Sequence, residues 1–374
     1  MSSPAPFIPC DQVRRFTWCV RRRSGLAAAL AAVAVVAAAV GATAGHLPDV
    51  LDTPPMQRAA AARATVTGIA ASGPTLIAVG PRGTLLRSTD SGTHWQAVTM
   101  PLSADLTSVR FSSPDTAWAV GHDAVILKST DRGATWARVL DGRILLKTLR
   151  QAAQSDTQLA KDVERTMSQS ASPDVWPTAL FDLMFIDAER GFAVGAFGLL
   201  LATSDGGKTW QGASDRTDNE RGFHLYVIQG EGGRPYIAGE QGVLLRLDEA
   251  GQRFARVESP YKGSLFGLAT SGEAVLAYGL RGNAFLSTDA GTSWRKLETG
   301  TDANLVGAAL PGGETLWLAT QGGDILTGTY ADAKLTVAAS APGPDLYGAV
   351  SLEPGRYAVA RLNGVATLEA RRGN

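Results

Sequence analysis

Short apolar stretches separated by turn residues recur along most of the chain. Each unit reads as an apolar strand, a turn, a second strand ending in Val-Gly or a variant of it, a two-residue turn, a third strand and a polar phrase. The Val-Gly positions are 40 to 44 residues apart, except for one step of 74; they are Gly80, Gly121, Gly195, Gly239, Gly279, Thr320 and Arg361. Seven units of four short strands at this period predict an all-β fold, a seven-bladed β-propeller.

The polar phrase has the pattern Ser/Thr-x-Asp-x-Gly-x-x-Trp and occurs four times. Its aspartate can accept hydrogen bonds from turn amides, while its glycine adopts a backbone angle that other residues avoid. The tryptophan is large enough to fill the wedge between blades. We therefore predict a structural role, not a catalytic one, for Asp90, Trp95, Asp131, Trp136, Asp205, Trp210, Asp289 and Trp294.

Three later units depart from this pattern, and the sixth, at Tyr330 to Leu335, has lost the phrase. The fourth has Phe254 in place of tryptophan and Glu249 at the position expected for the aspartate. The seventh, from Leu346 to Ala370, stops after three strands. Because an open sheet edge invites wrong pairing, we expect a fourth strand from the segment around Met56 to Arg63.

The long step reflects an insertion between the second and third units, from Leu140 to Ala179. Its apolar residues are spaced by three, four and seven, which predicts one or two amphipathic helices ending before Pro173. In a propeller, a connection between blades shares a face with the turns between second and third strands, opposite the Asp phrases. The helices are expected either to pack against the propeller or to project as a docking element.

The turns between second and third strands vary in sequence within an otherwise uniform repeat. Rigid scaffolds usually carry function on such loops. The candidate partner-binding residues on these turns are Arg82, His122, Asp123, Phe197, Gln241 and Arg281. The alternative is that they are ordinary solvated turn residues.

The amino terminus differs from the repeats. Basic residues precede an uncharged run from Ser24 to Gly45, rich in alanine and valine, which is typical of an export segment. It is either a signal peptide cleaved near Ala44 or a signal-anchor formed by residues 24–45. We divide the chain into this region (1–45), a linker (46–65) and the propeller (66–370, insertion 140–179).

Composition narrows the classes of function. The chain has 35 basic and 35 acidic residues, so non-specific nucleic-acid binding is not expected. Both cysteines, Cys10 and Cys19, precede the apolar run, which leaves the exported part without a disulfide. The four histidines and two cysteines form no zinc motif and the glycine turns form no phosphate loop, so we expect no cofactor or metal. We expect a monomer.

The polar phrase is similar to the Asp-box, or BNR, repeat of sialidases and other propellers. With the Val-Gly-x-x-Gly turn and the segment Phe192 to Trp210, the chain resembles the photosystem II assembly and stability factor family from about Val66 to Ala370. The resemblance implies a non-enzymatic, exported assembly or accessory factor for a membrane protein complex. Bacterial relatives of this kind imply a periplasmic location and, as one partner, a resistance-nodulation-division type transporter.

The Asp-box also leaves a second function open, a glycan-binding or sialidase-like glycoside hydrolase propeller. Glycosidases need two facing carboxylates. Asp123, Glu240 and Glu273 cannot be paired from the sequence, which therefore does not exclude hydrolysis.

Overall fold

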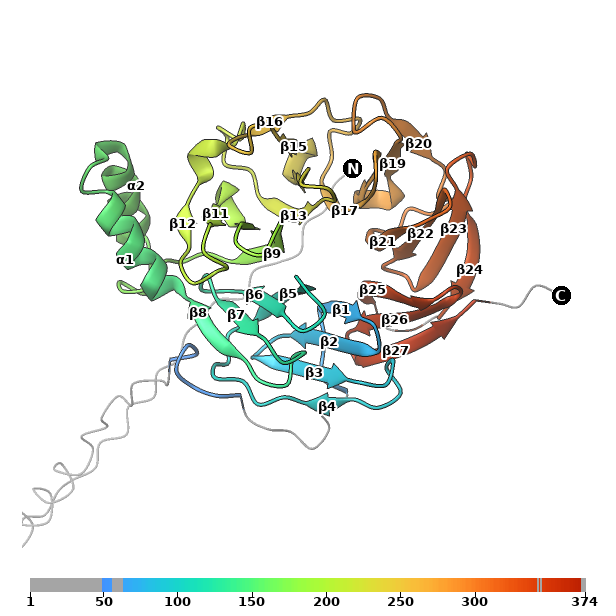
Figure 1. Ribbon diagram of the computed structural model, residues 1–374, viewed down its shortest axis with the longest axis horizontal. Helices are drawn as coiled ribbons and strands as arrows, with labels where there is room; N and C mark the ends of the chain where they lie inside the picture. The colour runs from blue at the N-terminus through green and yellow to red at the C-terminus, as the bar shows by residue number, and fades with distance from the viewer. Residues whose placement is uncertain (1–48, 56–62, 342, 344, 371–374) are drawn as a thin grey trace, which may run out of the picture. The chain divides into compact units, whose positions relative to one another are not determined.

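The computed structural model describes residues 49–55, 63–341, 343 and 345–370, and it is a seven-bladed β-propeller (Figure 1). The first three blades are β1 (Gly68–Ser72), β2 (Thr75–Gly80), β3 (Thr84–Ser88) and β4 (Gln96–Ala97); β5 (Leu106–Phe111), β6 (Ala117–Gly121), β7 (Ile126–Ser129) and β8 (Ala137–Leu140); and β9 (Leu180–Phe185), β10 (Gly191–Gly195), β11 (Leu200–Thr203) and β12 (Gln211–Gly212).

The remaining blades continue around the ring. They are β13 (Leu225–Gln229), β14 (Tyr236–Gly239), β15 (Leu244–Leu247) and β16 (Phe254–Arg256); β17 (Leu265–Ser271), β18 (Ala274–Gly279), β19 (Ala284–Ser287) and β20 (Arg295–Leu297); β21 (Leu305–Gly312), β22 (Thr315–Thr320), β23 (Asp324–Thr329) and β24 (Thr336–Ser340); and β25 (Leu346–Glu353), β26 (Arg356–Arg361) and β27 (Gly364–Glu369). The seven predicted Val-Gly positions each end the second strand of a blade, which confirms the blade count.

Glycine ends five of these second strands because the incoming backbone passes too close for a side chain. A Cβ atom at Gly121 would clash with the carbonyl oxygen of Asp105, and one at Gly239 would clash with that of His224. Both contacts involve the residue just before the first strand of the same blade. In these five blades the repeated glycine therefore marks the point where the end of the second strand passes very close to the backbone that enters the first strand.

The Asp-box turns have the predicted hydrogen bonds. Asp131 accepts the backbone N–H of Thr135 at 2.9 Å and its hydroxyl at 2.6 Å, and the Ser129 hydroxyl at 2.8 Å. Gly133 has φ +79°, in the left-handed region that glycine tolerates. Trp210 packs at the junction of blades 2 and 3, with its ring centroid 6.3 Å from that of Trp118. The phrase is a device for building blades.

In blade 4 the aspartate of the turn is Asp248, so the assignment of Glu249 to this position was wrong by one residue. Asp248 accepts the backbone N–H of Gln252 at 2.7 Å, the same four-residue bond that Asp90 accepts from His94 at 2.9 Å. The register differs because this turn has one more residue before its aromatic residue, Phe254. The degenerate phrase therefore retains its main hydrogen bond.

Blade 7 has three strands in the described residues. The chain entering blade 1 lies beside it: the Val66 N–H donates to the Arg361 carbonyl at 3.1 Å, and the Thr65 hydroxyl donates to the Leu362 carbonyl at 2.8 Å. The fourth strand expected around Met56 to Arg63 falls mostly on residues 56–62, outside the described residues.

The insertion forms two helices, α1 (Gly142–Ala152) and α2 (Thr157–Ser168), between blades 2 and 3 as predicted. Asp141 and Asp156 cap them by accepting backbone N–H groups of their first turns. Leu145, Leu146 and Leu149 of α1 join the hydrophobic core between these blades. α1 lies beside the outer strand β12 and α2 packs on α1, so the first helix is packed against the propeller and the hairpin stands out from its edge (Figure 1).

Residues 49–55, within the segment expected to be a linker, lie against the propeller and α1. Leu51 is only 1% exposed, and its carbonyl accepts a hydrogen bond from Arg138 at 2.6 Å. Asp49 and Asp52 both form ion pairs with Arg143 of α1. This stretch is therefore anchored at the base of the insertion.

The predicted export segment, residues 24–45, lies outside the described residues. In the part of the chain that the structure does describe, neither helix is long and apolar enough to cross a membrane.

A buried ion pair joins three blades at the central channel. Arg110 of β5 donates two hydrogen bonds to Asp182 of β9, both 2.8 Å long, and Asp182 also accepts the Ile228 N–H of β13 at 3.2 Å. Asp182 is almost fully buried, whereas the Arg110 side chain is 40% exposed. Burial alone would lower the pKa of Arg110, but the adjacent Asp182 carboxylate raises it above its usual value.

Replacing Asp182 tests this junction. Asp182→Ala leaves the Arg110 guanidinium and the Ile228 N–H without their partner, so we expect a loss of about 3 kcal/mol in the free energy of unfolding. Urea unfolding followed by tryptophan fluorescence measures it. Glu189→Ala, at an exposed turn, is the matched control and should change stability by less than about 0.5 kcal/mol. Equal effects of the two substitutions would contradict this role.

The Asp-box turns make stability depend on pH. Hydroxyl and backbone donors hold the pKa of Asp131, Asp205 and Asp289 at about 2. Because these pKa values lie below the unfolded value, the stabilisation is present above about pH 4 and is lost as pH falls towards 2.

The triple variant Asp131→Asn/Asp205→Asn/Asp289→Asn should have a lower Tm than the wild type at pH 7 and a shallower decrease in Tm between pH 4 and pH 2. Thermal unfolding followed by circular dichroism across this range measures both. An unchanged slope would show that other carboxylates control acid stability.

Candidate partner-binding face

One face of the propeller carries the turns between second and third strands and the connections between blades; we call it the insertion face. The Gly142 N–H, at the start of α1, donates to the Asp123 carbonyl at 2.6 Å, and the Ala124 N–H donates to the Thr178 carbonyl at 3.1 Å. On the opposite face, the backbone N–H of Arg132 in an Asp-box turn donates to the carbonyl of Asp115. Asp115 lies in the turn between the first and second strands of the same blade. The insertion thus emerges beside the variable turns, as predicted.

All six residues predicted to bind a partner lie on the insertion face. Five of them have positive φ between 50° and 57°, an uncommon conformation for residues other than glycine: Arg82, Asp123, Phe197, Gln241 and Arg281. The turn backbone holds these residues outward, and all but Asp123 are exposed, as is His122. Their role in binding remains a prediction.

These six residues do not form one polar cluster. The backbone N–H groups of Arg82 and Arg281 donate hydrogen bonds to the side chains of Asp105 and Asn304. Each acceptor lies just before the first strand of the next blade. Burial, together with neighbouring carboxylates such as Asp105, raises the pKa of Asp123. The turns are therefore tied separately to the connections between blades.

Aromatic side chains that the sequence analysis did not identify lie at the mouth of the central channel. Phe181, Tyr226 and Phe266, which we call the aromatic arc, occupy the same position in the first strands of blades 3, 4 and 5. The Phe181 and Tyr226 ring centroids are 5.7 Å apart, as are those of Tyr226 and Phe266. All three are half-buried.

A β-bulge places each member of the arc. Leu225 and Val227 pair with Gly239 and Ala238, which leaves Tyr226 as the extra residue of the strand. The pairings skip Phe181 and Phe266 in the same way. Because an extra residue redirects the strand, the repeated bulge turns one side chain per blade towards the channel mouth.

Phe197 extends the arc outward. Its side chain is 74% exposed, and its ring centroid lies 5.0 Å from that of His224, which in turn contacts Phe181 at 6.2 Å. The Phe197 N–H donates to His224 Nδ1 at 2.8 Å. A predicted turn residue and the aromatic arc therefore form one continuous surface.

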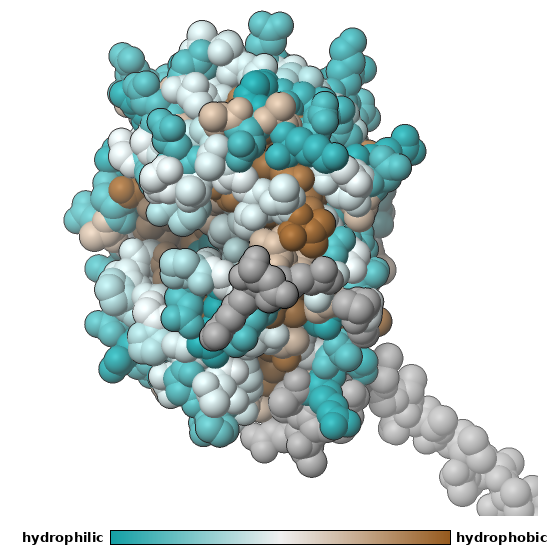
Figure 2. Space-filling view, turned by 90° about the vertical axis from the view of Figure 1, so that its right-hand side faces the viewer, coloured by the Kyte–Doolittle hydropathy of each residue, from teal (hydrophilic) through white to brown (hydrophobic). Residues whose placement is uncertain are grey.

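The arc opens into a cavity of about 480 Å³ lined by first strands from all seven blades. Tyr347 of blade 7 borders it and is also exposed. Figure 2 shows the outer side of the ring that lies at the right of Figure 1, where hydrophobic groups lie among hydrophilic ones. The insertion face thus offers a concave surface that combines the aromatic arc with polar lining groups such as Arg110 and Asp182, which suits a peptide or side chain from a partner.

A simple signal in the sequence could have revealed the arc. Aligning the first strands places an aromatic residue directly after a leucine in four units: Leu180-Phe181, Leu225-Tyr226, Leu265-Phe266 and Leu346-Tyr347. The glycines that end the second strands are the more conspicuous feature of the repeat.

The carboxylates give no observation that favours glycoside hydrolysis. Each Asp-box carboxylate is engaged within its own turn, as for Asp205 with Thr209. Glu273 pairs through its carbonyl with Ala290 of an Asp-box turn, so it lies on the face opposite Asp123 and Glu240. Hydrolysis needs two carboxylates on one substrate, and Glu273 cannot supply one beside the other two.

Comparison with known proteins places the chain in a family. The family described as "Photosynthesis system II assembly factor YCF48" matches residues 70–148 and 169–296, more than half of the chain. The photosystem II assembly lipoprotein Ycf48 of Synechococcus sp. (strain CC9902) is 32% identical over 117 residues, 30% of this chain and 35% of that protein. The chloroplastic photosystem II stability/assembly factor HCF136 of Arabidopsis thaliana is 29% identical over 123 residues, 31% of this chain and 30% of that protein. The aligned part is about a third of each curated relative.

Solved structures with low identity share the fold. YCF48 bound to D1 peptide has a TM-score of 0.60 at 14% identity, covering 86% of this chain and 99% of that one. YCF48 from Cyanidioschyzon merolae has a TM-score of 0.61 at 15% identity, covering 83% and 96%. The WD40 propeller of Doa1 scores 0.58 at 10% identity, covering 86% and 97%, so this likeness alone concerns architecture. With the family match, the chain belongs to the Ycf48 family of photosystem II assembly factors.

Proposed function

We propose that this chain is a non-enzymatic, exported assembly or accessory factor that holds a segment of a membrane protein on its insertion face. The observation that carries the proposal is the continuous aromatic surface formed by Phe197, His224 and the aromatic arc. Assembly factors act by binding, which requires an accessible and preorganised surface. The bulges and the rigid ring supply that preorganisation.

The ligand class follows from the shape and chemistry of the surface. A solved relative is described as bound to D1 peptide, so a propeller of this family can hold a peptide. In this chain, the half-buried rings of Phe181, Tyr226 and Phe266 would accept apolar side chains of an extended segment. Aromatic rings contribute large contact areas at low cost in conformational entropy.

We propose an exported location on two grounds. The uncharged run from Ser24 to Gly45 is typical of export, and the Synechococcus relative is described as a lipoprotein. A bacterial periplasm, with retention through residues 24–45 or cleavage near Ala44, remains the narrower proposal. The relatives' names concern photosystem II, so we keep the partner at the level of a membrane protein and do not propose the transporter expected from the sequence.

Site-specific photocrosslinking tests this assignment. A photoreactive amino acid at position 197 should crosslink in cells to a membrane protein identified by mass spectrometry. The same amino acid at position 337, on the outer strand β24 where Val337 is 53% exposed, should not. Absence of a membrane-protein adduct at position 197, or an equal adduct at position 337, would overturn the proposal.

The variant Phe197→Asn measures the contribution of the ring. Asparagine tolerates the left-handed backbone of this turn, so the fold should be retained while the contact is lost. Once crosslinking has identified the partner, we expect the amount of it that co-purifies with the full-length variant to fall at least about tenfold, as for an aromatic hot spot. Val337→Ser is the control and should change recovery less than about twofold.

A further inference from the structure

The two inserted helices carry a groove of their own on the outer edge of the propeller. It consists of two adjoining cavities of about 430 and 490 Å³ that share Arg150 and Gln154. We call this continuous surface the hairpin groove. None of the residues lining it belongs to the aromatic arc or to the predicted turn residues.

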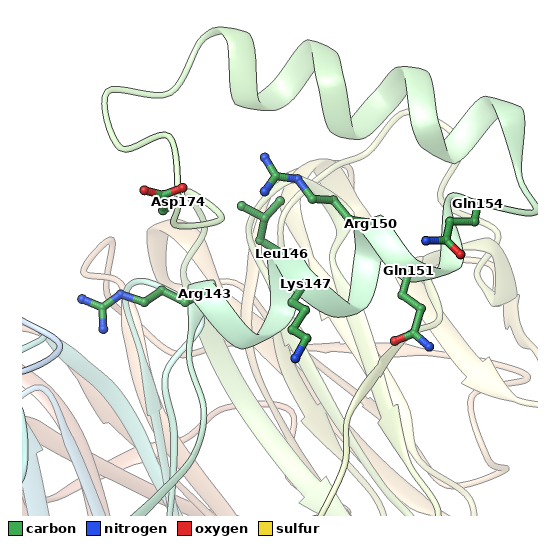
Figure 3. Close-up of a pocket in the computed structure, with 7 residues that line it drawn as sticks. All are labelled: Arg143, Leu146, Lys147, Arg150, Gln151, Gln154 and Asp174. Carbon is green, nitrogen blue, oxygen red and sulfur yellow. The ribbon is translucent and has the colours of Figure 1, made fainter.

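Basic side chains follow α1 along the groove. Arg143, Lys147 and Arg150 are spaced by four and three residues, which places them along one side of a helix, and all three line the first cavity (Figure 3). Lys147 and Arg150 form no ion pair with any residue that the structure describes. In this cavity Asp174 is the single acidic lining residue.

The second cavity continues the groove over an apolar floor. Ala153, Ala160, Val163 and Met167 line it, at the contact between α1 and α2. Glu164 is the acidic residue at this end. A groove with an apolar floor and one basic edge complements an amphipathic helix whose apolar face is bordered by carboxylates.

The chain itself shows how α1 receives an acidic segment. Asp49 and Asp52 form ion pairs with Arg143, and Leu51 between them is buried. Two carboxylates and one apolar side chain therefore dock at the first basic residue of the row. Lys147 and Arg150 continue the same row and have no ion-pair partner among the residues that the structure describes.

We propose that the hairpin groove binds an acidic amphipathic helical segment of a partner protein. Apolar side chains of that segment occupy the floor formed by Ala153, Ala160, Val163 and Met167. Its carboxylates pair with Lys147 and Arg150. The charge pairs set the orientation of the helix and its rate of association, while the floor supplies burial.

A synthetic peptide tests the proposal. The probe is a fluorescent helical peptide of about 18 residues, or five turns, with leucine on one face and glutamate along its border. It should bind the full-length protein in fluorescence anisotropy, and more weakly as ionic strength rises. A peptide with lysine in place of glutamate should bind at least about tenfold more weakly.

Charge reversal locates the binding. Lys147→Glu/Arg150→Glu should weaken binding of the acidic peptide at least about tenfold and improve binding of the lysine peptide. Lys161→Glu/Lys334→Glu changes the net charge equally at exposed positions outside the groove and should leave both affinities within about twofold. Ala160→Glu, which puts a carboxylate on the floor, should also weaken binding of the acidic peptide.

Three results would overturn the proposal: no binding of the acidic peptide, equal binding of the two peptides, or equal effects of the two double variants. Circular dichroism and Tm show that each variant is folded. Two further measurements separate this proposal from the proposed function. Phe197→Asn should leave the affinity for the acidic peptide unchanged. Lys147→Glu/Arg150→Glu should retain the crosslink from position 197.

Discussion

The close crossing between the first and second strands of each blade underlies both the fold and the candidate site. Where the second strand ends, the backbone that enters the first strand passes so near that a glycine is needed at Gly80, Gly121, Gly195, Gly239 and Gly279. Within two residues of this crossing the first strand bulges, in all the blades from the second to the seventh. In these six blades the bulge leaves one extra residue of the first strand beside the cavity at the channel mouth.

The bulged position is where the blades differ in chemistry. It is Thr107 in blade 2, aromatic in blades 3 to 5, Val306 in blade 6 and Tyr347 in blade 7. The bulged residues also differ in what they contact: the Thr107 hydroxyl donates to the Leu180 carbonyl of blade 3 at 2.6 Å, whereas the rings of blades 3 to 5 contact one another. The aromatic arc is therefore a local property of one side of a nearly symmetric ring.

Charged groups divide into those that build the ring and those that remain available. The Asp-box carboxylates are held by hydroxyl and amide donors within their turns, and Asp182 is held by groups from the two neighbouring blades. Arg143 of the insertion is engaged by Asp49 and Asp52. Lys147 and Arg150 have no such partners among the described residues, which leaves both charges available to the acidic segment proposed above.

Local sequence was sufficient for much of this structure. The period of the Val-Gly turns and the Asp-boxes predicted seven blades, the interruption predicted the position of the helices, and their apolar spacing predicted amphipathic packing. These features depend on contacts within one unit or between adjacent units, so each is visible in a short stretch of sequence. The one-residue error at Glu249 arose because a turn can lengthen while keeping its hydrogen bond, which pattern matching does not detect.

The sites depend on contacts that no single unit contains. Phe181, Tyr226 and Phe266 are about 40 to 45 residues apart in the sequence, and only closure of the ring and the bulges bring their rings within 5.7 Å. Asp49 is far from Arg143 in the chain, and only their contact in the folded structure indicates that the basic residues of α1 can receive carboxylates. The sequence by itself determined the blades and their order, because local hydrogen bonds and packing specify them. Tertiary structure alone decided which side chains share a surface, because that depends on how the blades close around one axis.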